Sequence, residues 1–206
     1  MLMPLLSIVL MASAGGAQTL QNLDRWAQGP VKWLLLSEER KEMRQLETDD
    51  AAELFIQRFW ERREFASDRA GKPFRESFGN HVEAADVLYG EGETRGSLTD
   101  RGRALILLGP PAHVSVSVEP GLAWEAGTAT SQQVTTRRIN IEEWGYRMEA
   151  LPEGTLQLWM SKKKAEEGPL ALTLTFRSQA DHTVLVAGEP LLETAARALV
   201  RNPLSD

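Results

Sequence analysis

Residues 96–111 have the sequence Gly-Ser-Leu-Thr-Asp-Arg-Gly-Arg-Ala-Leu-Ile-Leu-Leu-Gly-Pro-Pro, and here the chain changes from helical to strand patterning. Residues 99–102 predict a tight turn, because an Asp side chain can hydrogen-bond the backbone two residues on and glycine accepts the closing dihedral angles. The run 104–108 is apolar at every position, as in a strand covered on both faces. Pro110 and Pro111 cannot donate to a ladder and would end it. The stretch therefore predicts a central strand.

Three amphipathic helices are predicted before this stretch. Ser37 looks like the N-cap of the first helix, and Thr48 looks like the N-cap of the second. In the second helix, apolar residues recur every three or four positions from Ala52, and we interpret its aromatic stripe as core. The third helix follows Phe74. The charged run 61–64 is interpreted as a solvated last turn, with an anion site as the alternative.

Period-two alternation predicts strands after Pro111. Such runs occur at residues 114–118, 155–160 and 170–176, with two more strands expected around 144–146 and at 183–187. Residues 127–136 have no periodicity and predict a long mobile loop. A last helix is predicted over 191–200. The expected fold is α+β, with N-terminal helices packed on a mostly antiparallel sheet of about five strands, and a C-terminal helix.

The N-terminus has the pattern of a signal peptide. Leu2 to Ala12 is apolar and is followed by small residues, so we expect cleavage after Ala17, or alternatively after Ala14. An uncleaved anchor and a wrongly assigned start codon are the other interpretations. The predicted organisation is a signal peptide (1–17), a lead segment (18–36), a GWxTD-like α+β domain (37–188) and a C-terminal helix and tail (189–206). The expected location is periplasmic or secreted, with no stable membrane span after cleavage.

Composition and side-chain spacing argue against several functional classes. The net charge of −6 opposes non-specific binding to nucleic acid. The chain contains no cysteine, which excludes a lipid-bearing Cys at the cleavage site. His81, His113 and His182 fall in three different predicted elements, and no metal-ligand spacing, P-loop or dinucleotide fingerprint is present. We therefore expect no metal and no cofactor.

Several segments together resemble the GWxTD domain proteins of bacteria. These segments are Glu38-Glu39-Arg40, the run Phe55-Ile56-Gln57-Arg58-Phe59-Trp60-Glu61-Arg62-Arg63, Thr99-Asp100-Arg101-Gly102-Arg103 leading to Gly109-Pro110-Pro111, and Trp144-Gly145-Tyr146. The chain departs from the family pattern at Ser97, which replaces the signature tryptophan, and at Ala112-His113, which replace the usual acidic residue. The resemblance implies an exported α+β domain and no assigned enzymatic activity.

The predicted function is a non-catalytic binding or scaffold module of the cell envelope, whose partner is another envelope protein. The candidate binding residues are Thr99, Asp100, Arg101 and Arg103, and we interpret Asp100 and Arg101 as a structural latch between helix and sheet. The expected contact surfaces are the 127–136 loop, an exposed sheet edge, and a sheet face bearing Trp159, Thr173 and Thr175, unless the C-terminal helix covers that face.

Two alternative functions stay open. One is a structural envelope component that assembles by strand addition. The other is a hydrolase acting on an envelope or extracellular substrate, for which Glu64 with Asp100 is a candidate carboxylate pair. The adjacent residues Asp181 and His182 are the best candidate pair for a base and its orienting group, although neighbours on an extended chain point to opposite faces.

Overall fold

The computed structural model describes residues 20–64, 74–125, 133–151, 154–155, 158–160, 172–179 and 182–200. The N-terminal elements are α1 (Leu20–Gln28), the 3₁₀ helix η1 (Pro30–Trp33), α2 (Ser37–Met43) and α3 (Asp49–Glu61). They are followed by α4 (Phe74–Leu88), η2 (Gly96–Leu98), α5 (Asp100–Leu108), β1 (His113–Glu125), β2 (Gln133–Gly145), η3 (Met148–Ala150), β3 (Thr173–Gln179), β4 (His182–Ala187) and α7 (Glu189–Ala198). The predicted α+β class and C-terminal helix are confirmed.

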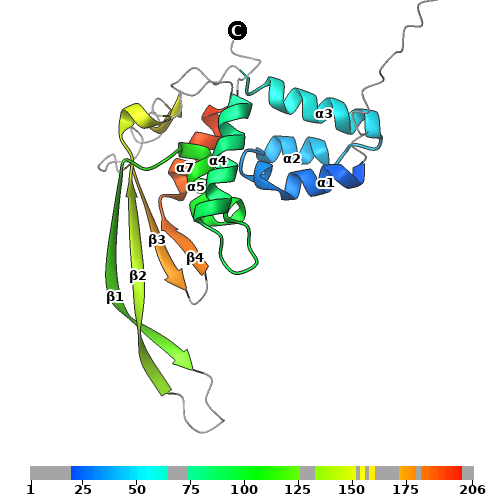
Figure 1. Ribbon diagram of the computed structural model, residues 1–206. Helices are drawn as coiled ribbons and strands as arrows, with labels where there is room; N and C mark the ends of the chain where they lie inside the picture. The colour runs from blue at the N-terminus through cyan, green and yellow to red at the C-terminus, as the bar shows by residue number, and fades with distance from the viewer. Residues whose placement is uncertain are drawn as a thin grey trace, which may run out of the picture.

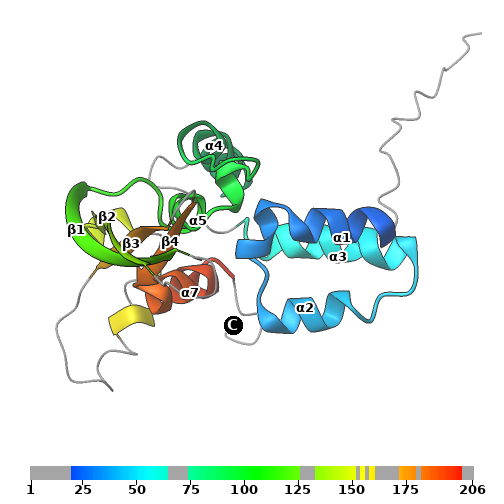
Figure 2. The same cartoon turned by 90° about the horizontal axis from the view of Figure 1, so that it is seen from below.

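The helices and the sheet occupy different parts of the molecule. Figure 1 shows α1, α2 and α3 together on one side, α4, α5 and α7 in the middle, and the sheet on the other side. Figure 2 shows the same order from below. The sheet is antiparallel with strand order β1-β2-β3-β4, so that β1 and β4 are its two edges. β1 and β2 form a long hairpin that extends beyond β3 and β4 (Figure 1).

The predicted strand over residues 104–108 is wrong, because these residues lie in α5. Thr99 is the N-cap of this helix, and its hydroxyl accepts a hydrogen bond from the Gly102 N–H, so residues 99–102 are a helix start and not a tight turn. The helix is buried all round, and a continuous apolar run does not distinguish a buried helix from a buried strand. It ends at Gly109, which has φ +76° and precedes Pro110.

The predicted strand over residues 155–160 is also wrong where the structure describes it. Thr155 and residues 158–160 are helical, and the Leu158 N–H donates to the Gly154 carbonyl at 3.0 Å. Residues 104–108 and this segment are helical, and the sheet formed by the described residues has four strands where about five were expected. The expected loop over 127–136 is also shorter than predicted, because Gln133 begins β2. Residues 127–132 lie outside the described residues.

The predicted helices α2, α3 and α4 are confirmed, although the N-cap of α2 is Leu36 and not Ser37. One core joins the aromatic side chains of α3 and α4 to those of the sheet. The stripe on α3 is buried as expected, with Phe55 2% and Phe59 0% exposed. Trp26 of α1, a helix that the sequence analysis did not predict, stacks edge-to-face on both rings. On the sheet, Trp144 packs against Phe176 at 4.9 Å between ring centroids. Alternation along β3 is confirmed, because Leu172, Leu174 and Phe176 are buried.

Candidate functional site

The predicted site residues lie together at the junction, which we define as residues 96–103, covering η2 and the first turn of α5. Two glycines allow its backbone to approach its neighbours. A Cβ on Gly96 would lie 1.8 Å from the Ala85 carbonyl oxygen of α4, and a Cβ on Gly102 would lie 1.9 Å from the Gly96 carbonyl oxygen. The backbone at Gly96 is therefore packed directly against α4, and the backbone at Gly102 is packed directly against η2, which only glycine permits at these positions.

Side chains from α4 and η1 hold the junction in place. Asp86 accepts a hydrogen bond from the Ser97 N–H at 2.8 Å and pairs with Arg95. Burial raises the pKa of the Asp86 carboxyl, but the hydrogen bonds from Ser97 and Arg95 outweigh it and hold that pKa below its usual value. On the other side, the Trp33 indole N–H donates to the Ser97 carbonyl at 2.8 Å. The Ser97 side chain is fully buried.

Asp100 links the junction to the sheet. One of its carboxylate oxygens accepts a hydrogen bond from the Leu185 N–H of β4 at 2.8 Å. Two residues earlier on β4, the Thr183 N–H donates to the carboxylate of Glu91 at 3.1 Å. Successive outward-facing N–H groups of an edge strand are two residues apart. Asp100 and Glu91 therefore cap the free edge of β4 with acceptors, as the interpretation of Asp100 as a latch requires.

Arg101 and Arg103 both take part in ion pairs within the molecule. Arg101 donates to Glu91 at 2.9 Å, lies 3.5 Å from Glu142 of β2, and stacks over Tyr89 at 5.3 Å. Arg103 donates to Glu189 of α7 at 2.9 Å. Its guanidinium lies 5.2 Å from the centroid of the Trp33 ring. Asp100, Arg101 and Arg103 thus join α5 to β4, β2 and α7, and Thr99 caps α5 within the junction.

A buried ion pair between α2 and α3 was missed by the sequence analysis. Arg63 is 0% exposed and donates to both carboxylate oxygens of Glu39, at 3.0 and 2.8 Å, and to the carbonyls of Phe59 and Leu34. Burial lowers the pKa of Arg63, and the hydrogen bond and charge of Glu39 oppose that change. The interpretation of residues 61–64 as a solvated turn is therefore wrong for Arg63. Periodicity within one helix could not supply Glu39 as a partner, because Glu39 lies 24 residues earlier in the chain.

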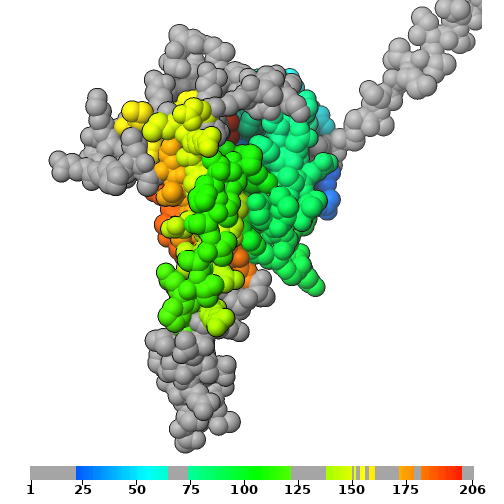
Figure 3. All heavy atoms as spheres, turned by 60° about the vertical axis from the view of Figure 1, so that its left-hand side comes forward, coloured from blue at the N-terminus to red at the C-terminus, as the bar shows by residue number. Residues whose placement is uncertain are grey.

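The β1 edge, which we define as residues 112–119, differs from the edge at β4. Val114, Val116 and Val118 are 45%, 65% and 56% exposed. A strand was correctly predicted at residues 114–118. The expectation that its valines would be buried against the core is wrong, because all three are exposed. Figure 3 shows β1, in green, at the surface of the molecule. Among the described residues, β2 is the only strand beside β1, so the other side of β1 has no strand partner.

The other predicted surface is not assembled as expected. Trp159 is 5% exposed and belongs to the core, which removes it from an outward face. Thr173 is exposed and Thr175 is partly exposed on β3, so these two residues remain at the surface. The inward-facing Leu174 of the same strand is fully buried.

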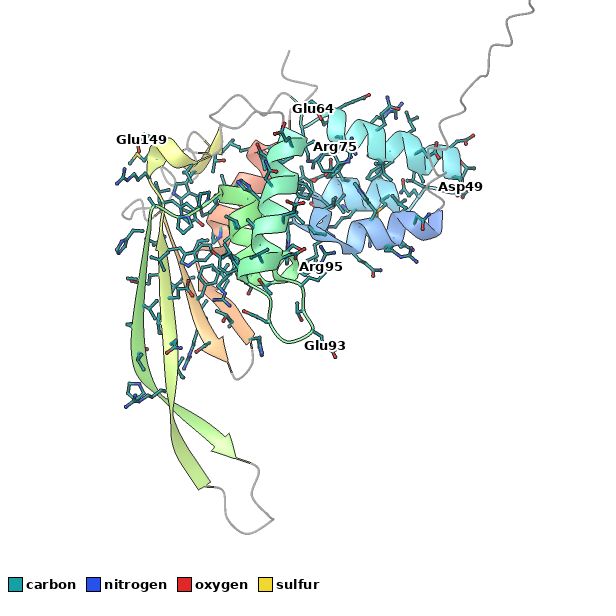
Figure 4. The ribbon with its side chains drawn as sticks, in the orientation of Figure 1. Asp49, Glu64, Arg75, Glu93, Arg95 and Glu149 are labelled. Carbon is teal, nitrogen blue, oxygen red and sulfur yellow. The ribbon has the colours of Figure 1, made fainter. Side chains whose placement is uncertain are left out.

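The candidate carboxylate pair, Glu64 with Asp100, is not brought together in the structure. Figure 4 shows Glu64 near the N-terminal end of α4, whereas Arg95, next to the junction, lies near the other end. Glu64 and the junction therefore lie toward opposite ends of α4. The three histidines lie on three separate elements, His81 on α4, His113 on β1 and His182 on β4. Asp181, the predicted partner of His182, lies outside the described residues. No group of three potential metal ligands is found in the described ranges.

Comparison of the chain with protein-family models, with curated proteins and with solved structures finds no match. None of the helices in the described ranges has the length and apolar character required to cross a membrane.

Proposed function

We propose that this chain is an exported, non-catalytic binding or scaffold module of the bacterial cell envelope, and that it binds its partner by strand addition at the β1 edge. The location rests on the predicted signal peptide and on the resemblance to the GWxTD proteins. The observation that carries the binding site is the difference between the sheet edges: β4 is capped by Glu91 and Asp100, and β1 exposes three valines.

Strand addition uses groups that an open edge already presents. Every second residue of an edge strand turns its N–H and C=O away from the neighbouring strand, and an extended partner can pair with these groups. The alternating valines then provide apolar contacts along one face. The junction residues are less suited to binding, because Asp100, Arg101 and Arg103 are already paired within the molecule.

A site-specific photocrosslinking experiment tests the proposal. Val116 on β1 and Val186 on β4 have similar exposure, 65% and 52%, and each is replaced in turn by a photoreactive amino acid in the chain expressed in its native cell. We expect a crosslinked product from position 116 only, with its components identified by mass spectrometry. Equal products from both positions, or none from 116, would contradict the proposed site.

Two further measurements test the rest of the proposal. The mass of the mature chain should correspond to cleavage after Ala17, and an intact Met1 in the exported fraction would contradict cleavage. A hydrolase substrate screen of the mature chain should show no turnover. Turnover that Asp100→Asn abolishes would show that the junction is catalytic.

A further inference from the structure

We propose that the strand added at the β1 edge is β1 of a second copy of this chain, paired antiparallel about a two-fold axis at Val116. This inference rests on the proposed function, because it names the partner of the edge already described. The product would be a symmetric dimer with one continuous sheet made of the two four-stranded sheets.

Two prolines limit the part of β1 that can pair. Pro111 precedes the strand and Pro120 lies within it, so residues 112–119 form an eight-residue segment in which every residue keeps its N–H. Proline is tolerated in a sheet where its missing donor faces away from the neighbouring strand, as at an edge. The two prolines therefore bracket the segment that is able to add another strand.

The sequence of this segment is suited to pairing with itself. With Val116 opposite Val116 of the second copy, Val114 lies opposite Val118, and Ser115 lies opposite Ser117. All three valines then meet valines on the same face, because directly opposed residues in an antiparallel pair share a face. A shift of the axis by one residue leaves at least one valine without a valine partner. The pattern thus favours one register.

The ends of the segment are complementary in the same register. His113 of each copy lies opposite Glu119 of the other, which places an imidazole, a hydrogen-bond donor, against a carboxylate at both ends. Both side chains are exposed in the single chain. Between His113 and Glu119, residues 114–118 are all valine or serine and carry no charge. The middle of the β1 edge therefore lacks the charged side chains that commonly prevent two edges from pairing.

The face of the valines also suits a second copy. Val114 is directly opposite Trp144, and Trp144 is 1% exposed, so the valines share the face of the sheet that forms the core. On β2 and β3 this face is covered, since Trp144, Leu174 and Phe176 are buried. On β1 the same face is exposed at all three valines. A second β1 would extend this face sideways and place its own valines against them.

Sedimentation analysis of the full mature chain over a range of concentrations tests the dimer. We expect reversible dimers, and Val116→Lys should raise the dissociation constant about tenfold or more, because it places two like charges opposite each other at the axis. The matched control is Val186→Lys on β4, which should leave dimerisation unchanged. Circular dichroism should show that both variants stay folded, since both valines are exposed.

A cysteine variant tests the register. The chain has no cysteine, so Val116→Cys introduces one thiol per copy, and directly opposed strand residues have Cα separations within the range that a disulfide spans. Mild oxidation should convert Val116→Cys, and not Val186→Cys, to a covalent dimer. A charge exchange gives a second readout: His113→Glu and Glu119→Lys should each weaken the dimer, and the double variant should recover it.

The outcomes separate this inference from the proposed function. A chain that stays monomeric at all concentrations, or a dimer indifferent to Val116→Lys, would overturn the second-copy proposal. If photocrosslinking from position 116 then identified a different protein, strand addition at the β1 edge would stand. A dimer that Val116→Lys dissociates, together with disulfide formation at position 116, would support the second copy.

Discussion

The two edges of the sheet are treated differently. At β4, the N–H groups of Thr183 and Leu185 donate to the carboxylates of Glu91 and Asp100. At β1, the described residues show no strand on the side away from β2, and Val116 is 65% exposed. An open edge favours association with other strands, and proteins commonly protect theirs with charges, prolines or covering elements. One edge of this sheet is protected and the other is available.

The protected edge depends on contacts far from the sheet. Asp100 is positioned by the N-cap of α5, and Glu91 is held by Arg101. The helix start itself is held by the packing of Gly96 and Gly102 against α4 and η2. The Gly-x-x-Thr-Asp-Arg-Gly segment therefore acts as a support for the β4 edge. We infer that changes at the junction will affect stability and the β4 edge, whereas changes at the β1 edge will affect association.

The largest effect is expected from Gly102→Ala. Its Cβ would lie 1.9 Å from the Gly96 carbonyl oxygen, and because the clashing atom belongs to the backbone it cannot be relieved by a rotamer change. We expect a loss of about 3 kcal/mol or more in the free energy of unfolding, measured by urea denaturation. Gly79→Ala in α4 is the matched control: nothing lies within 4 Å of its Cβ, so it should stabilise by about 0.5–1 kcal/mol. Equal changes in the free energy of unfolding for the two variants would contradict the close packing at Gly102.

A smaller effect is expected from Asp100→Ala, which removes the acceptor of the Leu185 N–H. The loss of a hydrogen bond to a charged acceptor should lower the free energy of unfolding by about 1–3 kcal/mol. Asp100→Asn keeps an acceptor oxygen and should cost less. Hydrogen exchange at the Leu185 amide should accelerate in Asp100→Ala, whereas the β1 amides should not respond. An unchanged melting temperature with lost partner binding would show instead that Asp100 is a functional residue.

The sequence predicted the elements whose patterns are unambiguous. Thr48 caps α3 as expected, and the apolar stripe from Ala52 is buried. Alternation placed β3, and the further strand expected at residues 183–187 is β4. Residues 104–108 were assigned to a strand because an apolar run without polar positions has no diagnostic period. The N-cap Thr99 followed by Asp100 was the signal that favours a helix start there.

The sequence predicted which residues form the candidate site, but not which residues they contact. Sequence spacing identified Asp100 and Arg101 as a latch, and the structure supplies Leu185, Glu91 and Glu142 as the groups that they hold. These partners are brought together by tertiary packing, which periodicity does not encode. The ion pair of Arg63 with Glu39 was missed for the same reason. Alternation of Val114, Val116 and Val118 predicted a strand correctly, but burial of that face depends on neighbours that β1 lacks.

The protected edge should also respond to acid through Asp86. The pKa of Asp86 is held below its usual value in the folded chain, so its contribution to stability is present above the unfolded pKa of about 4 and is lost as pH falls through the folded pKa. Because Arg95 is largely exposed, solvent screens part of this interaction. We expect Asp86→Asn to destabilise by about 1 kcal/mol at neutral pH and to match the original chain at pH below the folded pKa. A difference that grows in acid would contradict this assignment.

The smallest effect is expected from Val116→Lys on the stability of the single chain. Val116 is 65% exposed and lies opposite Glu142 on β2, so lysine loses little packing and gains an oppositely charged cross-strand neighbour. Measured at a concentration low enough to keep the chain monomeric, the free energy of unfolding should change by less than about 0.5 kcal/mol. At high concentration, the original chain should become more stable with concentration and Val116→Lys should not, because only the species that associates is stabilised by mass action. A loss of several kcal/mol in the monomer would show that Val116 packs within the chain, and the two edges would then differ less than the structure indicates.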